Sequence, residues 1–210
     1  MTEVATKGER TRARLTAAAA ALMQRQGYHA TGLAQIVEES GAPRGSLYFH
    51  FPGGKEELAV AALRDAGATW RTRIEAAIDG ATDLGAAVVA VCALFADELA
   101  ASDWQLGCPL ATVALEATTA SEPVRLTCAE HFAGWEASIA ARLTASGVAE
   151  DPARRMATFA LATIEGALML ARVERSPRPL EIVGDGLRVL IGLTAHSAPN
   201  TSTGAVIGVR

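Results

Sequence analysis

Residues 31–58, TGLAQIVEESGAPRGSLYFHFPGGKEEL, restrict the fold more than any other stretch, because they read as two short helices around a tight turn. The first helix is predicted to begin near Thr31, whose hydroxyl is typical of an N-cap. Its apolar side chains follow at spacings of three and four residues, which directs one apolar stripe toward a core: Leu33, Ile36 and Val37.

Gly41 is predicted to end this helix, since glycine readily adopts the positive φ that a helix C-terminus needs. Pro43 suits the first turn of the next helix, where its missing N–H costs no hydrogen bond. This second helix, residues 43–50, is too short to be stable alone and directs only Leu47 clearly into a core, with Phe51 just beyond it. The pattern is that of a helix-turn-helix.

Most side chains of the second helix are left free to contact a partner: Arg44, Gly45, Ser46, Tyr48 and His50. They combine a forked donor, a residue without a side chain, and hydroxyl or ring donors, which suit base edges and phosphates in a DNA major groove. Lys55 follows a Pro-Gly-Gly turn at the start of the next helix, whose N–H groups can also hold a phosphate. The stretch therefore predicts a DNA-binding surface.

Residues 40–51 read SGAPRGSLYFHF, and residues 55–58 read KEEL. This run resembles the signature of TetR-family transcriptional regulators, Ala-Gly-Val-Ser-x-Gly-x-Leu-Tyr-x-His-Phe followed by Lys-Glu-x-Leu. Two departures are that Pro43 replaces the common capping Ser and that the turn at 52–54 is one residue longer than in most members. The runs APRGSLY and FPGGK, with GCPL at 107–110, resemble the LmrA/YxaF branch.

The resemblance implies a one-component repressor that binds a palindromic operator as a homodimer. Members of the branch repress genes for drug efflux or for handling aromatic compounds, and they release DNA when such a ligand binds. Arg44 and Tyr48 are then predicted to read bases. Secondary or backbone contacts are expected from Gly45, Ser46, His50, Lys55, Thr31 and Gln35. For Gln35 and His50, a solvated or helix-capping side chain fits equally well.

The charge is unevenly distributed, although the chain as a whole is acidic with a formal charge of −4. Residues 1–55 hold seven Lys or Arg against four acids, which leaves the remainder strongly acidic. A modestly basic head on an acidic body fits local DNA contact. Four basic residues near the N-terminus either reach phosphates or form a solvated helix face: Lys7, Arg10, Arg12 and Arg14.

The three cysteines are an odd number without C-x-x-C spacing, so neither a disulfide framework nor a zinc site is indicated: Cys92, Cys108 and Cys128. They are expected to be reduced thiols in a cytoplasmic protein, with no metal or cofactor. The longest apolar run, Leu84 to Ala96, is too short to span a bilayer and predicts a buried helix. No membrane partner is expected.

The fold is predicted to be all-α, because no strand pattern occurs anywhere. Residues 1–54 are expected to form a three-helix DNA-binding head, with a mobile arm and a helix from Lys7 that Gly27 ends. Residues 55–195 are expected to form a C-terminal helical bundle for ligand binding and dimerisation, and residues 196–210 a disordered tail. The helices of the bundle are predicted at 55–78, 83–101, a short segment after Pro109, 121–146, 151–175 and 180–193.

The region after residue 151 carries more apolar and small side chains than one core face requires, which implies a partner: Met156, Phe159, Ala160, Thr163, Ala167, Leu168, Met169 and Leu170. The resemblance implies that the last two helices pair with their copies in a second subunit. Two recognition helices related by a two-fold axis would then read a palindrome.

A pocket for a hydrophobic or aromatic effector is predicted among helices four to eight, where the family's inducer binds: Trp70, Phe95, Trp104, Leu110, Glu116, Trp135, Phe159, Glu165 and Met169. The apolar members are equally ordinary core residues. Glu116 and Glu165 interrupt apolar stretches, so each either binds a ligand hydroxyl or cation or pairs with an arginine such as Arg172 or Arg142.

Catalysis is not predicted, because the four histidines are scattered and no nucleophile or phosphate-binding motif occurs. Cys108 before Pro109 is either a reactive thiol or a structural one. Two other classes of protein remain as alternatives. An effector-independent architectural protein would bind DNA with little sequence preference, and a helical small-molecule-binding enzyme would need turnover.

Overall fold

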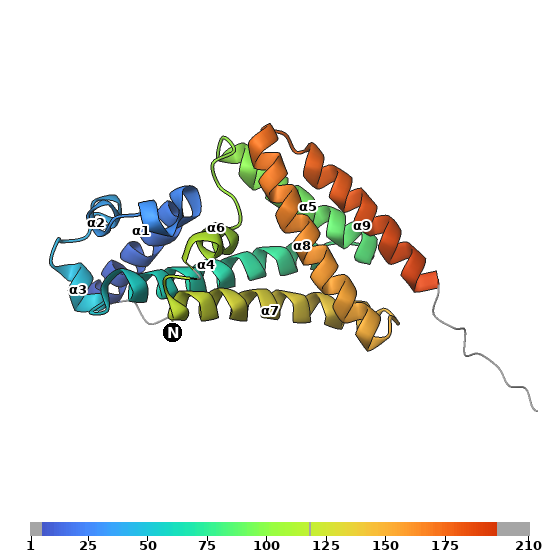
Figure 1. The fold of residues 1–210 in the computed structure, drawn as a ribbon, viewed down its shortest axis with the longest axis horizontal. Helices are drawn as coiled ribbons and strands as arrows, with labels where there is room; N and C mark the ends of the chain where they lie inside the picture. The colour runs from blue at the N-terminus through green and yellow to red at the C-terminus, as the bar shows by residue number, and fades with distance from the viewer. Residues whose placement is uncertain (1–5, 118, 197–210) are drawn as a thin grey trace, which may run out of the picture.

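The computed structural model describes residues 6–117 and 119–196, which form nine helices and no strand. The all-α prediction is confirmed. Figure 1 shows α1, α2 and α3 at one end of the molecule and α8 and α9 at the other, with α4 running between them. The helices are α1 (Lys7–Ala30), α2 (Leu33–Ser40), α3 (Ser46–His50), α4 (Gly54–Asp79), α5 (Leu84–Ala101), α6 (Pro109–Ala117), α7 (Glu122–Ala145), α8 (Glu150–Glu174) and α9 (Arg178–His196).

Helix α1 buries the apolar face that its spacing predicts: Leu15, Ala19, Leu22 and Met23. Thr6 caps its start, because the Thr6 hydroxyl accepts from the amide of Glu9 and the Glu9 carboxylate accepts from the amide of Thr6. Gly27 breaks the helix as predicted, with φ of 83° and ψ of 176°. One further turn then follows to Ala30, so the chain turns toward α2 later than the sequence suggested.

The start of α2 differs from its prediction, because Gly32 and not Thr31 is the N-cap. Its end matches, since Gly41 adopts the left-handed conformation with φ of 59°. Helix α3 begins at Ser46, three residues after the predicted start at Pro43. The carbonyl of Pro43 accepts from both the amide (2.9 Å) and the hydroxyl (2.6 Å) of Ser46, which makes a tight turn of these residues in place of a helical one.

Helix α4 connects the two ends of the molecule by packing on α1, α5, α6 and α7. It begins at Gly54, which has φ of 69°, one residue before the predicted start, and the Glu57 carboxylate accepts from the amide of Gly53 (2.8 Å). The large hydrophobic core runs without a break from Leu15 in α1, through Leu58 and Leu63 in α4, to Leu187 in α9. The domain boundary after residue 54 therefore remains a prediction.

The body is a helical bundle in which α5 packs most extensively on α9, and α7 on α8. Helices α5 and α7 begin within one residue of their predicted starts at 83 and 121. Asp83 caps α5 by accepting from the amide of Ala86 (2.8 Å), and Ser121 caps α7 by accepting from the amide of Val124 (3.3 Å). The predicted tail from His196 onward lies outside the described residues, except that His196 itself ends α9.

Two helices, α5 and α8, have the length and hydropathy of a membrane span. Helix α5 exceeds the thirteen-residue apolar run predicted from the sequence because it continues through Asp97 and Glu98 to Ala101. Core helices of helical bundles meet the same criteria, and α5 packs on α4, α8 and α9 while α8 packs on α7 and α9. This packing accounts for the buried apolar side chains of both helices.

Candidate DNA-binding surface and ligand cavity

Helix α3 is held by its buried side and exposes the opposite one. Leu47 is buried, and Phe51 just after the helix is fully buried, so these two side chains anchor it to the head. Tyr48 is 63% exposed and Phe49 82% exposed. Exposing two aromatic rings to water is unfavourable. A partner that covers both rings would therefore gain binding free energy.

The predicted DNA-contacting residues differ in how far they are exposed. Arg44, Gly45 and Gln35 are exposed, whereas Ser46 and His50 are half-buried. Gln35 exchanges side-chain hydrogen bonds with Gln26, the shorter of which is 2.9 Å. The aromatic ring of Phe49, which the prediction omitted, lies 5.0 Å from the ring of His50 in an edge-on arrangement. Its position two residues after the buried Leu47 was the available signal, because that offset reverses the helix face.

The predicted DNA contact of Thr31 is corrected, because this residue is completely buried and its side chain does not reach the surface. The Thr31 hydroxyl donates to the carbonyl of Gly27 (2.7 Å), so it caps the last turn of α1. The sequence reasoning placed this hydroxyl at the start of α2 because Thr is common there. The extra turn between Gly27 and Ala30 moves it to the end of the preceding helix.

Lys55 stands at the start of α4 as predicted, but its ammonium group already has partners within the protein. It lies 4.5 Å from the centre of the Tyr28 ring and donates to the carbonyl of His29 (3.4 Å). Partial burial lowers the Lys55 pKa, and the nearby Glu116 carboxylate opposes that shift. Lys55 therefore joins α4 to the end of α1, and a phosphate there would share this ammonium group with Tyr28 and His29.

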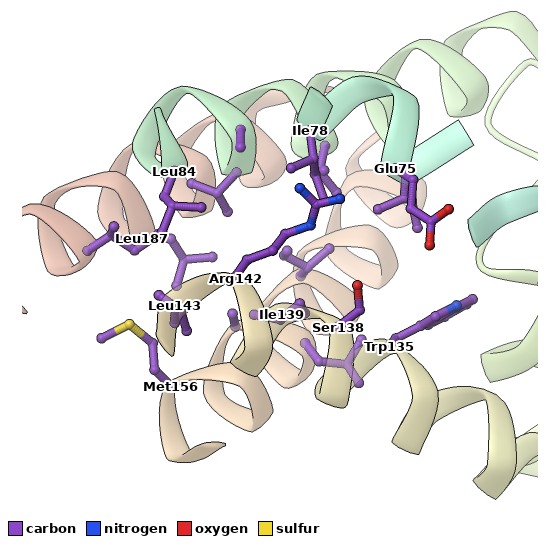
Figure 2. A pocket seen from close by; sticks show the side chains of 18 of the residues that line it. Glu75, Ile78, Leu84, Trp135, Ser138, Ile139, Arg142, Leu143, Met156 and Leu187 are labelled. Carbon is purple, nitrogen blue, oxygen red and sulfur yellow. The ribbon is translucent and has the colours of Figure 1, made fainter. Parts of the chain in front are cut away.

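A cavity lies in the body between α4, α5, α7, α8 and α9, and about 120 Å³ of it is open to the centre of a water molecule. That is roughly ten times the volume one water needs. Its walls are largely aliphatic, including Ile78, Leu84, Val88, Ile139, Met156 and Leu187. Figure 2 shows the Arg142 side chain reaching from α7 toward Ile78 on α4, and Arg142 forms an ion pair with Asp79 (3.1 Å).

Three of the nine predicted ligand residues line this cavity: Phe95, Trp135 and Glu165. Trp70 is buried behind the wall, with its ring stacked on Phe95 at a centroid distance of 4.7 Å. Leu110 is fully buried outside the cavity, and Trp104 is half-buried in the loop before α6.

The prediction that Phe159 and Met169 line the ligand cavity is corrected, because they are 52% and 61% exposed and are not among the residues of its wall. Both lie on an apolar surface that we call the α8–α9 surface, formed by exposed side chains of these two helices: Phe159, Met169, Leu170, Val173, Ile182 and Val189. The period of α8 places them opposite its buried stripe.

Glu116 also lies outside the cavity, where it joins α6 to the end of α1. Its carboxylate accepts from the amide of His29 (3.0 Å), and the His29 ring contacts the carbonyl of Glu116 (3.3 Å). A Cβ atom at Gly27 would lie only 2.0 Å from this carboxylate. Neither predicted arginine pairs with it, since Arg142 pairs with Asp79 and Arg172 donates to the carbonyl of Arg25 (3.1 Å).

Two polar groups of the cavity wall could bind a ligand, and one of them lacks the partner that burial normally requires. Trp135 is 7% exposed, and its indole N–H is a buried donor with no hydrogen-bond partner among the described residues. Burial raises the pKa of the Glu165 carboxyl, and the hydrogen bond from the Cys108 thiol only partly opposes that shift. A ligand in the cavity can therefore gain hydrogen bonds at two places on an otherwise apolar wall.

The three thiols are buried, and burial raises each pKa: to about 11 for Cys92 and Cys128, and well above its ordinary value for Cys108. The thiolate is the reactive form of cysteine, so all three favour the unreactive thiol at neutral pH. Of the two interpretations left open for Cys108, the structure favours the structural one.

Two family profiles match the chain and together cover most of it. The profile "Bacterial regulatory proteins, tetR family" matches residues 15–62, and "Transcriptional regulator LmrA/YxaF-like, C-terminal domain" matches residues 85–186. The chain is 39% identical over 173 residues to the uncharacterized HTH-type transcriptional regulator YxaF of Bacillus subtilis, covering 82% of this chain and 91% of that one. The HTH-type transcriptional regulator LmrA of the same organism is 36% identical over 169 residues, covering 80% and 90%.

Solved structures agree in fold. A TetR transcriptional regulator from Chloroflexus aurantiacus superposes with a TM-score of 0.76 at 30% identity, covering 89% of this chain and 96% of that one. A TetR-family regulator from Cytophaga hutchinsonii gives a TM-score of 0.79 at 21% identity, covering 91% and 98%. With its helix-turn-helix head and helical body, the chain therefore belongs to the LmrA/YxaF-like group of the TetR family, whose members are DNA-binding transcriptional regulators and not enzymes.

Proposed function

We propose that this protein is a one-component repressor that binds a palindromic operator as a homodimer and leaves it when a small, largely apolar ligand fills the cavity. The observation that carries the proposal is the presence, in one chain, of an exposed recognition helix at one end and, in the body, an apolar cavity walled by the unpartnered indole N–H of Trp135. Its place of action is the cytoplasm, where its DNA lies.

On the DNA side, Arg44 just before α3 and Tyr48 on α3 are proposed to contact base edges, because both are exposed and offer directed donors. Phe49 joins them as an apolar contact, of the kind that packs on the methyl group of thymine. Gly45 lets the helix approach the DNA closely. Weaker contacts to the backbone are assigned to Ser46, His50, Gln35 and Lys55.

The α8–α9 surface supports dimerisation. Six large apolar side chains exposed on two adjacent helices exceed what an isolated soluble chain needs, and a second copy would remove them from water. A two-fold axis through this surface would repeat α3 at a second position. Two recognition helices in that relation match the two halves of a palindrome.

Ligand release follows from linkage. A ligand that binds better to the arrangement with misplaced recognition helices shifts the dimer toward it, and it lowers operator affinity by no more than its differential affinity for the two arrangements. Phe95 offers an aromatic wall, Trp135 an unpartnered donor and Glu165 a half-buried carboxyl. An apolar molecule, aromatic or drug-like, with a polar edge fits this set.

The test is selection of an operator from random double-stranded DNA, followed by fluorescence anisotropy at two salt concentrations with random DNA as competitor. We expect a palindromic site bound at least about a thousandfold more tightly than random DNA. The Arg44→Ala variant should bind the operator roughly tenfold more weakly, or weaker still, and should discriminate less between bases. A protein that binds every sequence alike would instead be the effector-independent architectural alternative.

Release is tested on the same complex with a panel of aromatic and drug-like molecules, with melting temperature as a parallel measure of binding. A compound that raises the melting temperature and lowers operator affinity supports the proposal. Phe95→Ala should weaken both effects of that compound. A panel that stabilises the protein but never releases DNA would leave a ligand-binding repressor without induction and contradict this part of the proposal.

A further inference from the structure

Helices α4 and α7 run parallel, and their contacts fix which residues face each other across the cavity. Three contacts set this register, near the start, the middle and the end of both helices: Glu56 with Ser121, Gly67 with His131, and Asp79 with Arg142. In each contact the residue on α7 is numbered 63 to 65 above its partner on α4. By the same offset, Arg71 lies opposite Trp135 and Glu75 opposite Ser138, and all four line the cavity.

The polar groups on these two helices gather at one end of the cavity. Along α7, Trp135 and Ser138 come first and Leu143 last, which spreads the three over about 12 Å of helix. Figure 2 shows Glu75 on the same side as Trp135 and Ser138, and a group of apolar side chains on the opposite side: Leu84, Leu143, Met156 and Leu187. A molecule that fills the cavity should therefore have one polar end and one apolar end.

Three groups at the polar end have hydrogen-bonding capacity that the described residues do not meet. The indole N–H of Trp135 is a buried donor without a partner. The Ser138 hydroxyl makes no hydrogen bond to these residues, whereas Thr127 and Thr144 on the same helix donate to the carbonyl four residues earlier (2.8 and 3.0 Å). The half-buried Glu75 carboxylate has neither a hydrogen bond nor an ion pair among them. A ligand here can therefore gain hydrogen bonds without breaking any that the protein makes.

The charges at this end favour a cation. Arg71, one turn before Glu75, is exposed and does not form an ion pair with it among the contacts of the described chain. Arg142 is already paired with Asp79. Glu165 is the other carboxyl of the wall, but burial raises its pKa and so favours its neutral form. A positively charged ligand group would give the Glu75 carboxylate the partner that a charge on an apolar wall needs.

We propose that the ligand is an amphipathic amine, whose ammonium group binds the Glu75 carboxylate, whose neighbouring oxygen atom accepts from the indole N–H of Trp135, and whose apolar body extends toward Leu143. The Ser138 hydroxyl, opposite Glu75, can accept from the ammonium group or donate to the oxygen. The inference rests on the proposed function for the role of the cavity as the effector site. It adds the charge of the effector and its orientation in the cavity.

The test uses four compounds that share a phenylbutyl body and differ at one end: 4-phenylbutylamine, 1-amino-4-phenylbutan-2-ol, 4-phenylbutan-1-ol and 4-phenylbutanoic acid. Their binding to the full-length protein is measured near neutral pH without DNA, by calorimetry and by melting temperature. The amine should bind roughly tenfold more tightly than the alcohol, and the acid roughly tenfold more weakly, because only the amine gives Glu75 a charge-assisted hydrogen bond. The amino alcohol should bind about threefold to tenfold more tightly than the amine, since its oxygen also meets Trp135.

Three variants assign these preferences to residues. Glu75→Gln removes the charge and keeps the size of the side chain, so the amine should then bind within about twofold of the alcohol. Glu136→Gln is the matched control and should keep the preference for the amine, because Glu136 is half-buried and next to Trp135 but does not line the cavity. Trp135→Phe should remove the advantage of the amino alcohol over the amine, a ratio that a general loss of packing would not change.

Equal binding of the amine and the alcohol, tighter binding of the acid, or an amine preference that survives Glu75→Gln would overturn the proposal. If Glu165→Gln removed the preference in place of Glu75→Gln, the cation would lie on α8 and the assignment would be wrong. Operator release is measured separately with the preferred amine. An amine that binds as expected but never releases DNA would contradict induction in the proposed function and uphold the ligand assignment. Failure of all four compounds to bind would contradict both.

Discussion

Gly27 is the residue whose identity the structure restricts most. Its φ of 83° and ψ of 176° lie in a region that essentially only glycine occupies, and a Cβ there would meet the Glu116 carboxylate at 2.0 Å. We expect Gly27→Ala to lower the free energy of unfolding by about 1–3 kcal/mol, measured by urea denaturation. Gly134→Ala, in an exposed part of α7 with open space at its Cβ, should instead stabilise by about 0.5–1 kcal/mol. Equal effects of the two changes would contradict this account.

Glu165 gives stability a particular dependence on pH. Burial raises the pKa of the Glu165 carboxyl above its ordinary value of 4.5, so the folded protein holds this proton more tightly than the unfolded chain does. The contribution of this proton to the free energy of unfolding is fully present below pH 4.5, and it is lost as the pH rises through the pKa of Glu165 in the folded state. Glu165→Gln should therefore be more stable than the parent near pH 8, with a difference that shrinks toward acid pH. A stability difference that grows on acidification would mean that folding lowers the pKa of Glu165, and it would contradict this account.

Phe49 allows DNA contact to be tested apart from folding, because this residue is 82% exposed and its ring meets the His50 ring edge-on. We expect Phe49→Ala to lower operator affinity roughly tenfold, which corresponds to about 1.4 kcal/mol, while the melting temperature stays within about 2 °C of the parent. Phe51→Ala is the contrasting change, since that ring is fully buried and its loss should lower the melting temperature markedly. Full operator affinity in Phe49→Ala would remove the ring from the DNA interface.

At the scale of elements, the sequence predicted the helices well wherever a local signal ends them. Gly41 ends α2, and Asp83 and Ser121 cap the starts of α5 and α7, which are the positions that these residue types favour. The prediction failed at Thr31 and at the start of α3, where a hydroxyl bonds backward to a carbonyl and so extends or delays a helix. Such a hydroxyl has two local partners within reach, and only the folded chain chooses between them.

The cavity was less predictable than the helices, because lining residues and ordinary core residues have the same chemistry. Phe95 lines the cavity, Phe159 is exposed on α8, and nothing in the two side chains distinguishes them. What separates them is the packing of α8 against α7 and α9, a long-range property. The two glutamates show the same limit, since only Glu165 reaches the cavity, whereas Glu116 contacts α1.

The α8–α9 surface leads to a prediction for the two helices as a unit. Ile182→Asp introduces a charge into the apolar surface near the start of α9, where an acid does not harm the helix itself. We expect the dimer dissociation constant to rise about a hundredfold, measured by sedimentation velocity, because a buried unpaired carboxylate is costly. Leu115→Asp is the control, since Leu115 is also an exposed apolar residue but lies on α6. If only the Leu115→Asp variant dissociated, the dimer interface would lie at α6 and not at the α8–α9 surface.

The molecule as a whole is joined by more than the α4 connection. One hydrophobic core passes from α1 into the body, and polar contacts add to it: Glu116 with the amide of His29, Gln24 with Gly107 and Arg172 with Arg25. A head that shares its core with the body cannot lose its own packing without exposing part of the body's. Head and body should therefore unfold together.

We expect a single thermal transition, coincident by far-ultraviolet circular dichroism and by tryptophan fluorescence. The comparison is informative because all three tryptophans lie outside the head, at Trp70, Trp104 and Trp135, whereas dichroism reports every helix. The midpoint should rise with protein concentration if unfolding is linked to dissociation of the dimer. An earlier transition seen only by dichroism would mean that the head melts alone, as a separate domain ending near residue 54 would. The contacts at Glu116 and Gln24 would then guide the orientation of the head without contributing to its stability.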